Sequence, residues 1–123
     1  MTDSEKLCWS AGFLEGEGTF SFYHTPRIRA TQVQKEPLDR LSESFGGNVT
    51  LVSREYARNK GKKEQDSWQW TLGGTPAIIL MFRLYPLMSR KRQEQISVAL
   101  EDALANGGSK HLSVISDQIK KVS

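Results

Sequence analysis

The sequence has little cysteine and no long hydrophobic run. Cys8 is the one cysteine among 123 residues, so no disulfide can form within the chain. No apolar stretch approaches the roughly 20 residues needed to span a bilayer, and no secretory signal is visible at the N-terminus. We therefore expect an intracellular protein, cytoplasmic or organellar, that does not interact with membranes.

The chain also lacks internal linkers and low-complexity segments, so residues 1–123 are predicted to form one domain with a modest core. The formal net charge of +3 and the pI near 9.1 are only weakly informative. The basic residues gather in two places, each of which could be a solvated surface or a contact to phosphate groups. The two clusters are Arg54, Arg58, Lys60, Lys62 and Lys63, and then Arg90, Lys91 and Arg92.

Residues 9–18 are the most informative stretch, because they predict a helix that ends where a strand begins. Ser4 is a plausible N-cap, and good helix formers follow it up to residue 14. Glu17 then lies at the C-terminal end of the helix, where the partial negative charge of the helix disfavours a carboxylate. A divalent metal ion would remove that penalty.

Gly12 and Gly16 lie four residues apart on the same helix face. Each glycine inside a helix costs roughly 1 kcal/mol relative to alanine, so some other interaction should compensate. Close approach of a second helix along this face would do so, as in other small-residue helix pairs. The two glycines therefore predict a helix–helix interface.

The rest of the pattern predicts an α+β fold. Apolar and polar residues alternate after residue 18, which indicates strands joined by a turn at Thr25 and Pro26. A bulge is expected near Val33, which falls in register with outward polar residues. Thr75 is predicted to cap a later helix, and Ser89 another. Further elements are predicted over residues 38–45, 48–54, 68–72, 77–85 and 90–105, with Val49, Leu51, Trp68 and Trp70 facing the core.

Residues 10–18 resemble the signature motif of the LAGLIDADG homing endonucleases. Ser10 stands where the motif usually has leucine, and Glu17 stands at the catalytic position, where the family uses either acid. The resemblance continues through residues 34–35, 45–47, 70–72 and 86–93. It implies an αββαββα core, in which a saddle-shaped sheet of four antiparallel strands carries helices on one face.

The resemblance also implies a homodimer, because chains of this family with one motif act as symmetric pairs. The nearest second copy is residues 100–108, which would place Gly107 where the acid must be. Gly12 and Gly16 would then form the dimer interface.

The activity implied is site-specific hydrolysis of both strands of a long pseudo-palindromic DNA duplex. Glu17 and Gly16 would hold Mg²⁺ or Mn²⁺, and no other small-molecule cofactor is expected. By the same resemblance, Gln34 would order the water network and Lys91 would stabilise the charged transition state. Arg90 or Arg92 could exchange roles with Lys91, and Glu15 is the next candidate for a metal ligand.

The outward face of the predicted sheet would contact the DNA. A strand advances about 3.3 Å per residue and a DNA strand about 3.4 Å per base pair, so two strands can follow base edges in the major groove. Any solvated sheet face has similar polar residues, and it is the motif that favours DNA. The DNA-contacting residues are predicted to be Ser21, Tyr23, Arg27, Arg29, Thr31, Lys35, Thr50, Arg54, Gln69 and Thr71.

Two other functions remain open at this point. The same fold serves nucleic-acid-binding modules that do not cleave, such as intron splicing factors and transcriptional regulators. Those regulators commonly lose the acid that is present here as Glu17. A structural dimer without a nucleic-acid ligand would show no salt-sensitive DNA binding.

Overall fold

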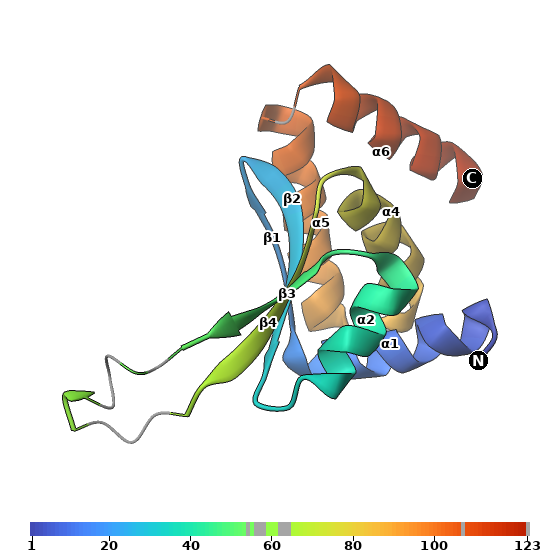
Figure 1. Ribbon diagram of the computed structural model, residues 1–123. Coiled ribbons are helices and arrows are strands. Elements are labelled where there is room, and N and C mark those ends of the chain that lie inside the picture. Colours follow the sequence, from blue (N-terminus) through green and yellow to red (C-terminus); the bar gives the residue numbers. More distant parts are fainter. Residues whose placement is uncertain (54, 56–58, 62–64, 107, 123) are drawn as a thin grey trace.

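The computed structural model describes residues 1–123 except 54, 56–58, 62–64, 107 and 123. Its elements confirm the predicted α+β class and the αββαββα order, followed by further helices (Figure 1). In chain order they are α1 (Asp3–Glu17), β1 (Gly18–Tyr23), β2 (Thr25–Gln32), α2 (Glu36–Phe45), β3 (Asn48–Val52), β4 (Ser67–Gly73), α4 (Thr75–Leu84), the short 3-10 helix η1 (Tyr85–Leu87), α5 (Arg90–Asn106) and α6 (Ser109–Val122).

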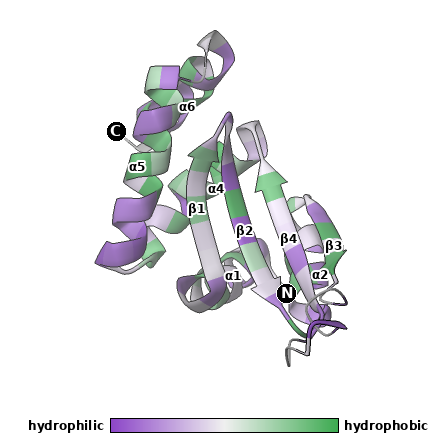
Figure 2. Ribbon diagram, turned by 90° about the vertical axis from the view of Figure 1, so that its left-hand side faces the viewer, coloured by the Kyte–Doolittle hydropathy of each residue, from purple (hydrophilic) through white to green (hydrophobic). Residues whose placement is uncertain are grey.

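The four strands form one antiparallel sheet in the order β1-β2-β4-β3. Figure 2 shows one face of this sheet toward the viewer, with α1, α2 and α4 behind it and α5 beside β1. The helices therefore cover one face and leave the other accessible. None of the helices in the described ranges is both long and apolar enough to cross a membrane.

The alternating apolar residues of the strands make the core against the helices. Ile28 and Trp70 are fully buried, and Phe20 is 5% exposed. The Trp70 indole also donates from Nε1 to the carbonyl oxygen of Gly46 at 2.9 Å, which satisfies its polar atom inside the core. On the helix side the core contains Ala11, Leu14, Leu38, Leu41, Ala77, Leu80, Met81, Leu84, Ile96 and Ala99.

The turn and the bulge predicted around the second strand are both wrong. Thr25 and Pro26 belong to β2, where they pair with Tyr23 and Phe22. The chain reverses at His24, whose φ of 61° is a left-handed conformation that histidine adopts more readily than most residues. No bulge is needed near Val33, because β2 already ends at Gln32 and Val33 lies in an exposed bend.

Two helix starts, those of α1 and α4, differ from the predicted residues, whereas Ser89 precedes α5 as predicted and its hydroxyl accepts from the N–H of Arg92. Thr2, not Ser4, caps α1, because its side chain accepts from the backbone of Glu5 while Glu5 accepts from the backbone of Thr2. Gly74, not Thr75, precedes α4, and Pro76 still occupies the first turn as expected.

The predicted core is confirmed for Trp70, but Leu51 is 52% exposed. Leu51 lies near the C-terminal end of β3. It pairs there with Trp68, which is itself only partly buried. Strand alternation alone does not show where the helices stop covering a sheet.

Gly47 provides a test of how α2 is joined to β3. Gly46 and Gly47 both have positive φ, 85° and 91°, but a Cβ on Gly47 would lie 2.6 Å from the carbonyl oxygen of Thr71 and one on Gly46 would meet nothing within 4 Å. We expect Gly46→Ala to lower the free energy of unfolding by roughly 1–2 kcal/mol and Gly47→Ala by at least about 1 kcal/mol more. Urea titration of both variants measures this difference, and equal losses would contradict the close contact.

Candidate active site and nucleic-acid interface

Glu17 is the last residue of α1 and is exposed. Gly18 follows at once as the first residue of β1, and its N–H bonds to the carbonyl oxygen of Leu14. Among the residues that the structure describes, none forms a hydrogen bond or an ion pair with the Glu17 side chain. This carboxylate therefore stands at the negative end of α1, the position that the sequence predicted, and no cation of the described residues pairs with it.

Gly12 and Gly16 are exposed on the same helix. A Cβ built on either would have no atom within 4 Å, so nothing in the described part of the chain requires a glycine at these positions. Contacts among the described residues therefore do not explain why two glycines, each costing helix stability relative to alanine, occupy these positions.

Glu15 has a different environment from Glu17, although only one residue separates them. Its two carboxylate oxygens accept from the backbone N–H of Ser89 at 2.6 Å and from the Ser89 hydroxyl at 2.7 Å. The Ser89 hydrogen bonds hold the pKa of Glu15 below its ordinary value, and the positive charges of Arg92 and Lys91 act in the same direction. Both carboxylate oxygens of Glu15 are therefore occupied by hydrogen bonds within the chain.

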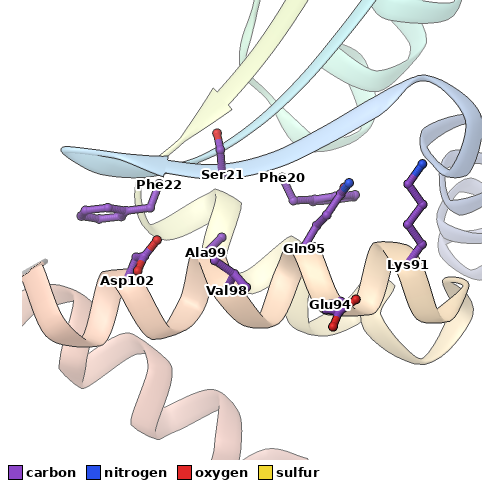
Figure 3. Close-up of a pocket in the computed structure, with 9 residues that line it drawn as sticks. All are labelled: Phe20, Ser21, Phe22, Lys91, Glu94, Gln95, Val98, Ala99 and Asp102. Carbon is purple, nitrogen blue, oxygen red and sulfur yellow. The ribbon is translucent and has the colours of Figure 1, made fainter.

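The structure also separates the three basic residues at the start of α5. Arg92 is directed to α1, since its Nε donates to the carbonyl oxygen of Glu15 at 2.9 Å. Arg90 is exposed and lines a shallow pocket together with Tyr85. Lys91 is exposed at one end of a cavity of about 420 Å³ between α5 and β1, and Figure 3 shows its side chain extending from α5 to the β1 side.

Gln34 and Lys35 lie beyond the end of β2. The strand stops at Gln32, and Gln34 is exposed in the following bend. Lys35 precedes α2, where its ammonium group is 3.9 Å from Asp39 and 5.0 Å from the centroid of the Trp68 ring. Lys35 is therefore held near α2, whereas Gln34 is open to solvent.

The polar residues of the accessible sheet face form rows that run across the strands. Arg29 pairs with Thr19 on one side and with Thr71 on the other, and Thr71 pairs with Asn48. A second row contains Thr31, Gln69 and Thr50, and Gln69 donates from Nε2 to the hydroxyl of Thr71 at 3.2 Å. A third row contains Ser21 and Arg27, followed along β1 by Tyr23, whose ring lies under the Arg27 guanidinium.

These rows unite most of the predicted contact residues and add two that the sequence analysis did not select. Thr19 and Asn48 are exposed and complete the row of Arg29 and Thr71. Strand alternation already places Thr19 on the face of Ser21 and Asn48 on the face of Thr50, and the pairing register then aligns both with Arg29 and Thr71. Arg54 lies outside the described residues, as do Arg58, Lys62 and Lys63 of the first basic cluster.

The end of α1 has the chemistry that a hard divalent cation requires. A carboxylate from Glu17 and a backbone carbonyl from Gly16 are both oxygen donors, and the last carbonyls of a helix lack partners inside it. A cation would also offset the negative end of the helix. Within the described part of one chain, no three His, Cys, Asp or Glu side chains form a potential metal site.

Comparison with solved structures shows which proteins share this fold. The homing endonuclease I-CvuI, in complex with the I-CreI target and 2 mM Mg with the DNA not cleaved, gives a TM-score of 0.63 at 18% identity over 94% of this chain and 76% of that chain. I-CvuI with its own target and 2 mM Ca gives 0.55 at 19% identity, over 97% and 95% of the two chains. The archaeal intron-encoded homing endonuclease I-Vdi141I, complexed with DNA, gives 0.59 at 16% identity, over 97% and 85%.

No protein-family model matches the sequence, and no curated protein matches it at a significant level. The fold likeness places the chain in a class of α+β proteins with a four-stranded antiparallel sheet beside helices. More particularly, it is the fold of the LAGLIDADG homing endonucleases. The resemblance found in residues 10–18 is thus joined by a likeness of the whole fold.

Proposed function

We propose that the chain is a site-specific DNA endonuclease of the homing type, which acts as a homodimer with divalent metal ions. The observation that carries this proposal is the contrast between the two acids at the end of α1. Glu15 is bonded to Ser89, whereas Glu17 is exposed at the junction with the polar sheet. Solved structures of the same fold include endonucleases bound to DNA, which supports duplex DNA as the substrate.

Pairing of α1 with its symmetry copy would complete the site. The open space at Gly12 and Gly16 permits another helix to approach closely, and a two-fold axis along this face would bring two copies of Glu17 together. One chain supplies too few clustered ligands among its described residues, so the second acid would come from the partner.

The roles of the residues follow from their chemistry. Glu17 and the Gly16 carbonyl would hold Mg²⁺ or Mn²⁺, which when bound polarises a phosphate oxygen and lowers the pKa of a bound water. Lys91 would offer its ammonium group to the charge that develops on the phosphate, and Gln34 would orient water with its amide. Hydrolysis then forms a bond from the water oxygen to phosphorus and breaks the bond to the leaving sugar oxygen, which takes up a proton.

The rows on the sheet face would read the DNA. Arg27 and Arg29 can each donate two hydrogen bonds to guanine, and Gln69 can pair with adenine. The hydroxyl groups of Ser21, Thr31 and Thr50 are small and can adapt to several bases. No observation on the described residues favours RNA splicing or transcriptional regulation over cleavage, because the acid is present and accessible.

The cleavage experiment uses a library of randomised DNA duplexes incubated with the purified protein and Mg²⁺, followed by sequencing of the cut ends. We expect one recurring pseudo-palindromic site for the wild type and no cut site for Glu17→Gln, which removes the charge but keeps the size. Retention of the selected duplex by Glu17→Gln should persist, since lost repulsion from phosphate does not weaken binding. A mixed dimer with one altered copy should be impaired on both strands or nick slowly.

The matched control is Glu101→Gln, because Glu101 is an exposed acid of α5 far along that helix from Ser89. It should cut at the wild-type rate. Double-strand cleavage by Glu17→Gln at the wild-type rate would show that Glu17 is not the catalytic acid. Salt-sensitive duplex binding by the wild type without cleavage would instead support a binding module that does not cleave.

Arg29 offers a test of DNA reading. Arg29→Ala should weaken binding of the selected duplex by about 1–3 kcal/mol and relax the preference at one position in each half-site. Arg83→Ala is the control, since Arg83 is exposed on α4 in the layer behind the sheet. Fluorescence titration against single-base variants of the duplex measures both effects. Equal behaviour of the two variants would remove Arg29 from the contact surface.

Gly12 tests the assembly. Gly12→Leu should fold, because a Cβ at this position meets no atom of the described residues within 4 Å, but the larger side chain should block close approach of the second helix. We expect the wild type to sediment as a dimer and the variant as a monomer without cleavage activity. Glu101→Leu, a similar apolar substitution on an exposed helix face, should remain dimeric. A dimeric and active Gly12→Leu would show that the chains associate through another face.

A further inference from the structure

We propose that Glu15 and Arg92 are positioning residues, which form a clamp between the end of α1 and the start of α5 and thereby fix Glu17 relative to Lys91. This proposal rests on the function proposed above. The clamp is defined by Glu15, Ser89 and Arg92, which are joined by hydrogen bonds between residues 74 or more positions apart in the sequence.

The first half of the clamp is the Glu15 carboxylate. Both of its oxygens accept from Ser89, one from the backbone N–H and one from the hydroxyl. Ser89 directly precedes α5, so the negative charge lies at the positive end of that helix, where it is stabilised. A carboxylate held in this way is a poor candidate for a metal ligand, because each oxygen already accepts a short hydrogen bond.

The second half is Arg92. Its Nε donates to the main-chain oxygen of Glu15 at 2.9 Å and lies 3.8 Å from the Glu15 carboxylate, while Nη1 donates to the Gln95 side chain at 2.9 Å. The Arg92 side chain is only 13% exposed, so it is packed between the two helices and is not available to a phosphate. It satisfies one of the carbonyl groups that the last turn of α1 leaves unpaired.

The clamp adjoins, in the sequence, both groups that would act on the phosphate. Glu17 follows Glu15 by two residues, and Lys91 lies between Ser89 and Arg92 in the sequence. A shift of the α1 end against α5 would therefore change the separation of Glu17 and Lys91. Small displacements of this kind can reduce a reaction rate by about 100-fold without loss of binding.

The experiment compares Arg92→Met, Glu15→Leu and Glu15→Gln on the duplex selected by the wild type. Arg92→Met keeps the length of the side chain but removes its donors, and Glu15→Gln keeps an oxygen that can accept from Ser89. We expect single-turnover cleavage at saturating Mg²⁺ to slow by about 10- to 100-fold in Arg92→Met and Glu15→Leu and by less in Glu15→Gln. Duplex affinity and the Mg²⁺ concentration for half-maximal rate should stay within about twofold of wild type.

A second readout does not depend on cleavage. Hydrogen exchange at the amides of Glu17 and Gly18 should accelerate in Arg92→Met and Glu15→Leu relative to the middle of α1, whereas Glu17→Gln should leave it unchanged. Arg83→Met and Glu101→Gln, whose exposed side chains lie outside the clamp, should match the wild type in every measurement.

The outcomes separate this proposal from the proposed function. Unchanged exchange together with full-rate cleavage in Arg92→Met would overturn the clamp. A tenfold or larger rise in the Mg²⁺ requirement of Glu15→Gln would make Glu15 a metal ligand and would also overturn it. If the wild type binds duplex but does not cut, the proposed function fails, and faster exchange in the variants would still support the clamp.

Discussion

The close contact between Gly18 and the last turn of α1 determines where the Glu17 carboxylate lies. Gly18 bonds to the Leu14 carbonyl oxygen, and a Cβ at position 18 would come within 2.7 Å of that same oxygen. No larger residue fits there, so β1 can begin at the residue after the helix only because position 18 is glycine. Glu17 is thereby placed at the meeting point of helix, sheet and solvent.

The helix that carries Glu17 is fixed on one side and open on the other. Leu14 and Ala11 are buried against the sheet and neighbouring helices, and the clamp joins its last turn to α5. In the described part of the chain, no atom lies within 4 Å of a Cβ built on Gly12 or Gly16. Under the proposed function this combination suits a symmetric helix pair, because pairing would position both copies of Glu17 without reshaping either chain.

Much of this arrangement could be predicted from the sequence, because its causes are local. The alternation around Phe20 and Ile28 defined the strands, and the motif at residues 10–18 indicated the fold and the acid. The turn at His24 was missed because Thr25 and Pro26 have the stronger turn preference, and the pairing of the strands outweighed it.

The position of Glu17 at the end of α1 and the placement of most selected polar residues on the accessible sheet face could be predicted from the sequence, but the contacts that organise them could not. The sequence alone did not show which of the adjacent cations Lys91 and Arg92 bonds to α1. The structure shows that Arg92 does, because it donates to Glu15, 77 residues away. Similarly, the pairing register shows that Thr19 and Asn48 lie in one row with Arg29 and Thr71, which the alternation within each strand does not show. Contacts distant in sequence, not residue types, decide these assignments.

The rows on the sheet face lie at regular intervals from Glu17. Successive outward residues of β1, namely Thr19, Ser21 and Tyr23, lie at increasing distances from Glu17, in steps of about 6.6 Å that match roughly two base pairs of DNA. Under the proposed function, the distance of a row from the acid would thus specify how far from the cut its base pairs lie. Recognition could then change one row at a time during evolution, while the position of the cut stayed the same.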